Sequence, residues 1–151
     1  MGTRGTITII YKGRTIKIYN HLDSYPAGLG QSLVDDIKKI LELYGLEWLR
    51  DKVLNIKIVN NGEVPSEIVI NELAVYTDLD VSKKSTSDWY CLLRKTQGSL
   101  INLLNAGYAL EYDDDGEYNY VIDLDENQFT FNETETIFIL NKIPDNWQEM
   151  V

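Results

Sequence analysis

Residues 6–19 read TITIIYKGRTIKIY, and this stretch decides the sheet that we predict. Its two arms, 6–11 and 15–19, are rich in isoleucine, threonine and tyrosine, which suit the pleated surface of a strand. Lys12, Gly13 and Arg14 lie between the arms, and glycine readily adopts the positive φ that a tight turn requires. The stretch therefore predicts a β-hairpin.

Helical periodicity follows the hairpin. Apolar residues from Leu33 to Tyr44 share one helical face, which predicts a helix over 31–44 that ends at Gly45. A short helix over 46–54 and a strand over 56–59 are expected next. Three further helix starts are indicated by residues typical of N-caps; these are Ser66, Asp88 and Ser99.

The C-terminal third changes to short strand-like runs over 108–112, 118–124, 128–131 and 136–140. Acidic turns separate the first three runs, which is typical of an antiparallel meander. We expect the meander and the hairpin to form one largely antiparallel sheet, with helix 31–44 on one face and Trp147 packing back onto it. The predicted fold class is α+β, in a single domain over 1–151.

The charge of the chain limits its partners. It has 24 acidic and 14 basic residues in 151, a formal net charge of −10. Binding to nucleic acid depends on clustered Lys and Arg, so a general nucleic-acid binder is not expected. No apolar run approaches the roughly 20 residues that span a bilayer, so no membrane association is expected. Cys91 is the only cysteine and cannot form an internal disulfide, so we expect an intracellular protein.

The densest polar stretch is 19–30, YNHLDSYPAGLG, which holds the only histidine. On an extended chain the side chains of His21 and Asp23 would face the same way. A histidine beside a carboxylate could act as a general base or as a metal ligand. Ser24 follows them, and Gly28 and Gly30 could leave backbone amides free for an anion at the start of the next helix. Arg4 would lie nearby if the hairpin pairs as expected.

A structured loop is the competing interpretation of this stretch. Its polar side chains would then bond local backbone groups, and its glycines would serve the turn. We expect a structural role for His21 alone and a binding site for the pair of Arg4 and Asp23. The two interpretations stay open at this point.

A second polar cluster is 88–98, DWYCLLRKTQG. Arg94 and Gln97 could line a pocket with Trp89 or Tyr90 as its wall. Arg94 could equally be the structural partner of an acidic residue.

The turn 123–127 matches the first positions of a calcium loop but lacks its Gly and its bidentate Glu, so no specific Ca²⁺ site is expected. No other metal and no cofactor is predicted.

Three stretches, 1–5, 19–30 and 88–98, resemble segments of a group of small uncharacterised proteins of tailed phages, bacteria and large DNA viruses. The quoted patterns are the MGTRG opening, the HxDSYPxGLG loop and the DWYxLLRxTQG segment. The resemblance implies a viral or mobile-element accessory protein, in the host cytoplasm or the virion. It implies no activity.

The leading hypothesis is a non-enzymatic module that binds a protein or a small-molecule partner, with a homo-oligomer left open. The first alternative is a small hydrolase or transferase centred on Arg4, His21, Asp23 and Ser24. One version, an N-terminal-nucleophile enzyme, needs Cys, Ser or Thr as the mature first residue, where this chain would have Gly2. The second alternative is a structural component of a virion.

Overall fold

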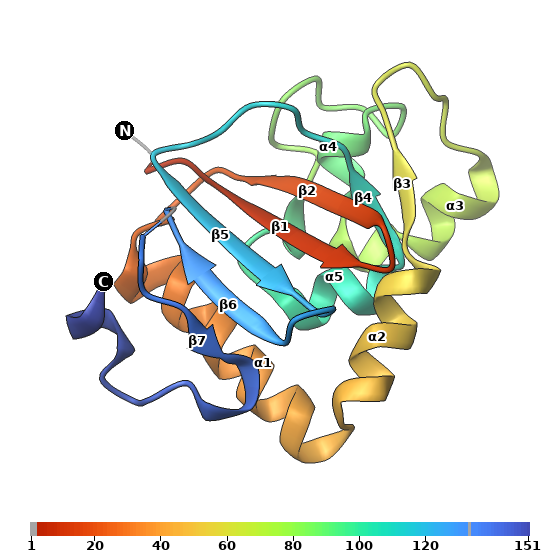
Figure 1. The fold of residues 1–151 in the computed structure, drawn as a ribbon. Coiled ribbons are helices and arrows are strands. Elements are labelled where there is room, and N and C mark those ends of the chain that lie inside the picture. Colours follow the sequence, from red (N-terminus) through yellow and green to blue (C-terminus); the bar gives the residue numbers. More distant parts are fainter. Residues whose placement is uncertain (1–2, 133) are drawn as a thin grey trace.

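A five-stranded, mostly antiparallel sheet forms the centre of the fold. The computed structural model describes residues 3–132 and 134–151 and has the α+β architecture that the sequence predicts. The strand order is β2-β1-β5-β6-β7 (Figure 1). The strands are β1 (Gly5–Tyr11), β2 (Arg14–Asn20), β5 (Tyr118–Asp123), β6 (Gln128–Phe131) and β7 (Phe138–Ile139).

The predicted hairpin is confirmed. β1 and β2 pair antiparallel with Ile7 opposite Ile18 and Ile9 opposite Ile16, so alternate isoleucines reach the buried face. Lys12 and Gly13 both have positive φ, 49° and 73°, as a two-residue turn of type I′ requires. This register also places the start of β1 beside the end of β2, which matters for the site.

The first strand of the predicted meander lies elsewhere. β4 (Tyr108–Leu110) pairs parallel with β3 (Lys57–Val59) in a separate two-stranded sheet, and β5 pairs parallel with β1. The pairing with β3 is parallel because the chain between the two strands includes helices, which make a crossover long enough to return in the same direction. Only β5, β6 and β7 form the meander. β7 is shorter than the expected run 136–140, and residues Leu140–Lys142 after it form a 3-10 helix.

Helices α1, α2 and α5 cover one face of the large sheet (Figure 1). The predicted face of α1 is fully buried at Leu33, Val34, Ile37 and Ile40. The three expected N-caps are confirmed, since the side chains of Ser66, Asp88 and Ser99 each accept a hydrogen bond from a backbone N–H in the first turn. The helices are α1 (Gln31–Leu43), α2 (Leu46–Asn55), α3 (Glu67–Glu72), α4 (Trp89–Leu92) and α5 (Leu100–Ala106).

The C-terminal segment closes the core as predicted. Trp147 is 0% exposed, and its indole meets the rings of Phe129 and Phe138 edge-on. Its Nε1 donates to Gln31 at the start of α1. In the part of the chain that is described, no helix has the length and apolarity to cross a bilayer.

Candidate functional site

A cavity of about 390 Å³ lies where β2, β4 and the segment from α4 to α5 meet. Its volume is within the range of small-molecule sites. Residues far apart in the sequence line it; these are Arg4, Ile18, Tyr19, Asn61, Ser82, Lys83, Asp88, Tyr90, Leu93, Thr96, Gln97, Leu103, Ala109, Leu110, Glu111 and Tyr112.

Three tyrosines form one side of this cavity, and we call them the tyrosine wall: Tyr19, Tyr90 and Tyr112. The ring centroid of Tyr19 lies 5.0 Å from that of Tyr112 and 6.4 Å from that of Tyr90, with tilted planes. Such rings offer flat apolar area with a polar hydroxyl at the edge. The wall therefore suits a planar ligand.

Backbone hydrogen bonds fix the position of Arg4 at the cavity. The carbonyl of Arg4 accepts hydrogen bonds from the amides of Glu117 and Tyr118, which fixes it beside the start of β5. The loop before β5 also passes over β2, where Tyr112 donates its amide to the carbonyl of Lys17. One loop thus holds both Arg4 and Tyr112 in place.

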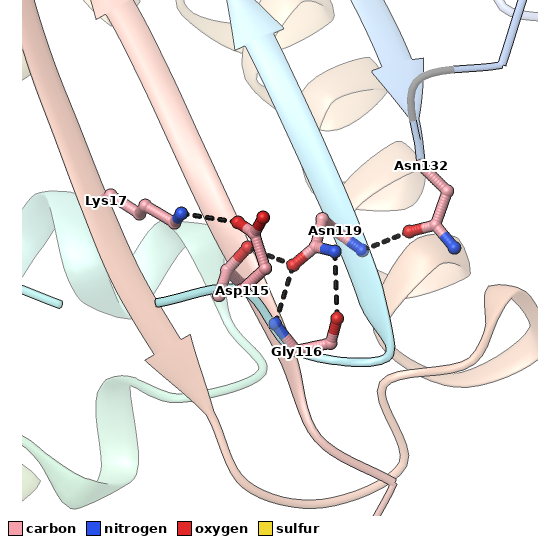
Figure 2. A network of polar contacts seen from close by, with 6 residues as sticks. Lys17, Asp115, Gly116, Asn119 and Asn132 are labelled. Atoms are coloured by element: carbon pink, nitrogen blue, oxygen red, sulfur yellow. Dashed lines mark hydrogen bonds and ion pairs between the residues drawn. The ribbon is translucent and has the colours of Figure 1, made fainter. Parts of the chain in front are cut away.

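Figure 2 shows the polar network that holds this loop. Asn119 Oδ1 accepts from the Gly116 amide at 2.9 Å, and Asn119 Nδ2 donates to the Gly116 carbonyl at 2.9 Å. The amide of Asn119 donates to Asn132, and Lys17 forms an ion pair with Asp115 at 2.5 Å. Thr6 Oγ1 also donates to Asn119 Oδ1. Asn119 is therefore the centre of the network.

Replacing Asn119 by alanine should lower the free energy of unfolding by about 1–3 kcal/mol, because it strands the buried Thr6 hydroxyl and the Gly116 amide. Urea unfolding of the variant measures this. Asn102→Ala is the control, since that side chain makes one exposed hydrogen bond and should change stability by less than about 0.5 kcal/mol. Equal stability of the two variants would contradict the role of Asn119.

His21 forms one hydrogen bond through its side chain and one through its backbone amide. Its Nδ1 lies 2.8 Å from the hydroxyl of Tyr19, and its amide donates to Gln97 Oε1 at 2.9 Å. Burial lowers the pKa of His21 below its ordinary value, and the positive charges of Arg94 and Arg4 lower it further. The imidazole is therefore held in its neutral form, with Tyr19 as its hydrogen-bond partner.

The lowered pKa of His21 predicts a pH dependence. The unfolded chain takes up the histidine proton at a higher pH than the folded chain does. The stability of the protein should therefore fall as pH drops through the ordinary value of 6.5 and the lower folded value. Urea unfolding between about pH 7.5 and about pH 5 measures this. His21→Gln should lose stability less steeply over the same range; parallel curves for the two proteins would contradict the shift.

Arg94 lies at the turn after α4, next to the lining residues Leu93 and Thr96. Its Nε is buried and has no hydrogen-bond partner in the described residues. Its positive charge is one of the causes that lower the pKa of His21. The expected alternative, a carboxylate partner for Arg94, is not formed within residues 3–132 and 134–151.

The expected pair of Arg4 and Asp23 forms no ion pair among the described residues. Asp23 has a positive φ of 53°, so the chain is not extended there and the i, i+2 alignment with His21 fails. Its side chain is exposed and has no hydrogen bond or ion pair to Arg4 or His21 among the described residues. Arg4 lines the cavity, and Asp23 is not among the lining residues.

Ser24, Gly28 and Gly30 have structural roles in the loop 19–30. Ser24 is fully buried, and its hydroxyl accepts from Asn20 Nδ2 at 2.8 Å. Residues Pro26–Gly30 form a π-helical turn whose amides bond the carbonyls of Asp23 and Tyr25, so the amides that we expected to be free for an anion are occupied. At Gly30 a Cβ would lie 2.7 Å from the Trp147 ring, so this glycine allows close packing.

Asp88 also lines the cavity, but its hydrogen bonds are to its own segment of the chain. Its carboxylate accepts from the amides of Lys83 and Tyr90. Burial raises its pKa, but these hydrogen bonds and one from Ser82 outweigh burial, and the pKa lies below its ordinary value.

In the acidic turn 123–127, the Asp123 carboxylate accepts from two backbone amides within the turn.

Sequence reasoning missed part of the site. Tyr90 was one of two candidates for the wall; Trp89 instead is buried, stacks on Tyr108 and donates to the carbonyl of Glu63. Tyr112 was assigned only to a strand, and Tyr19 to a strand and to the start of the polar stretch 19–30. Nothing in their local pattern shows that they meet, because the contact depends on how β2 and β4 pack.

Comparison with known protein families, with curated proteins and with solved structures found no match for this chain. The fold and the cavity together define the class: an α+β protein with an aromatic cavity beside its main sheet.

Proposed function

We propose that this protein is a non-enzymatic binding module that holds a small molecule in the cavity against the tyrosine wall. The observation that carries the proposal is the cavity itself, in which Arg4, Tyr19, Gln97 and Tyr112 come together from four separate segments. Gln97 lines the cavity, and its side-chain oxygen accepts from the His21 amide, so Nε2 is the remaining donor of this side chain. A few polar groups on an apolar surface are typical of small-molecule sites.

The same contacts favour binding over the alternative of catalysis. A hydrolase or transferase centred on His21 would need a nucleophile or a carboxylate bonded to the imidazole. The imidazole is bonded to a tyrosine hydroxyl, and the Ser24 hydroxyl is bonded to Asn20. The position of the nucleophile in an N-terminal-nucleophile enzyme, Gly2, lies outside the described residues.

The place of this module in a cell follows only from the resemblance to phage, bacterial and large-virus proteins. We propose that it acts as an accessory protein inside the cell that expresses it, in the host cytoplasm or in the virion if its gene is viral. Two of the partner classes considered, a protein partner and a homo-oligomer, would use the surface rather than the cavity. The cavity favours the third class, a small-molecule partner.

An NMR titration tests the proposed function. The ¹⁵N-labelled protein would be titrated with three ring compounds of different charge: phenyl phosphate, benzyl alcohol and benzylamine. We expect at least one compound to cause saturable shifts at the amides of Tyr19, Gln97 and Tyr112.

Tyr112→Ala should weaken that binding about fivefold, since a ring contact contributes about 1 kcal/mol. Tyr44→Ala is the matched control, because Tyr44 is 57% exposed and stacks on Trp48 away from the cavity. Shifts that are absent from the cavity for all three compounds, or equal losses in both variants, would overturn the proposal.

A further inference from the structure

The arginines of this chain indicate what the cavity binds. The sequence has four. Arg14 donates to three backbone carbonyls at the C-terminal end of α2. Arg50 donates to Glu47, to the carbonyl of Leu124 and to Asn127. These two arginines are structural, since their donors are used within the fold.

Arg4 and Arg94 are different. Within residues 3–132 and 134–151 neither side chain has a hydrogen bond or an ion pair, and the Nε of Arg94 is buried. Arg4 lines the cavity, whereas Arg94 lies in the chain between two lining residues, Leu93 and Thr96. The guanidinium of Arg4 therefore keeps its donors available at the cavity, where an anionic ligand could accept from them.

The charge of the whole chain makes this arrangement informative. With 24 acidic and 14 basic residues, carboxylates are abundant, yet none pairs with Arg4 or Arg94 in the described part of the chain. Two carboxylates do line the cavity. Asp88 is committed to the amides of its own segment, and Glu111 is exposed at the rim, where Lys83 also lies.

We propose that the ligand is a small ring compound that carries a phosphate or carboxylate group, with the anion on Arg4 and the ring against the tyrosine wall. The guanidinium fork matches the paired oxygens of either anion. Arg94, the neighbour of the lining residue Leu93, adds a second positive charge, and Gln97 Nε2 is a neutral donor on a lining side chain. The proposal rests on the proposed function and adds the chemical class of the ligand.

The test compares matched probes on the full chain by NMR titration: phenyl phosphate, benzoate and uncharged benzyl alcohol. We expect one of the two anions to bind at the cavity at least about tenfold more tightly than benzyl alcohol, as for charge-assisted hydrogen bonds. The tighter of phenyl phosphate and benzoate identifies which anion the site prefers.

Variants assign the effect to the arginines. Arg4→Gln, at an exposed position, should weaken anion binding about tenfold and weaken benzyl alcohol binding clearly less. Arg94→Gln should weaken it less, and Arg94→Lys, which keeps the charge if the glutamine variant fails to fold, should retain most of it. Lys38→Gln is the control, since Lys38 pairs with Asp145 outside the cavity.

Two results would overturn the proposal, and they differ. If benzyl alcohol binds the cavity as tightly as both anions, or if Arg4→Gln leaves anion binding unchanged, the ligand class is wrong while the proposed function stands. If neither these three probes nor benzylamine shifts the cavity amides, the proposed function fails and the ligand class fails with it.

Discussion

Replacing Trp147 by alanine should lower the free energy of unfolding by about 3–5 kcal/mol, the cost of removing a large buried ring. Trp147 is 0% exposed, packs edge-on against Phe129 and Phe138, and donates to Gln31. The variant would lose this hydrogen bond and leave a cavity between β6, β7 and α1. Equilibrium unfolding in urea measures the change.

Trp48→Ala serves as the comparison for this prediction. Trp48 is half-buried and stacks on the exposed ring of Tyr44 at 4.4 Å, so its loss leaves no enclosed cavity. We expect it to lose clearly less stability than Trp147→Ala. A cost below about 1 kcal/mol for Trp147→Ala would show that the C-terminal segment is not part of the core.

Replacing Gly28 by alanine should lower the free energy of unfolding by about 3 kcal/mol or more, at the upper end of the effects of overpacking. A Cβ at this position would lie 2.1 Å from the carbonyl oxygen of Asp23, and that oxygen is backbone held by the Leu29 amide. The loop 19–30 would have to open to make room. Thermal or urea unfolding of the variant measures the loss.

Gly62→Ala is the control for Gly28→Ala, because its added Cβ meets only the side chain of Asn60, at 3.1 Å. We expect a change within about 0.5 kcal/mol. If Gly28→Ala were as stable as Gly62→Ala, the loop would not be the tightly packed structure described above, and a more open binding loop would be favoured again.

Local patterns predicted the elements whose formation depends on neighbouring residues. The hairpin follows from its β-branched arms and the Lys12–Gly13 turn, and the N-caps at Asp88 and Ser99 follow from side chains that bond nearby amides. The hairpin register also explains why Arg4 could be expected near His21, since Gly5 pairs with Asn20. These inferences needed no knowledge of distant contacts.

The remaining features depend on distant packing, which one sequence does not show. Residues 108–110 look like any strand, and nothing in them indicates that their partner is β3. The alignment of His21 with Asp23 assumed an extended chain, but the positive φ of Asp23 removes it. Gln97 was expected to line a pocket, but its meeting with Tyr112 and Arg4 depends on folding of the whole chain. The convergence of these residues could be found only in the structure.

A crystal structure of the protein grown with phenyl phosphate is the most direct test of the central claim, that the cavity holds a small anionic ring compound. We predict that the phosphate accepts hydrogen bonds from Arg4 and that the phenyl ring contacts Tyr19 or Tyr112. Phenyl phosphate bound only on the surface away from these residues, with the cavity unchanged, would contradict the claim.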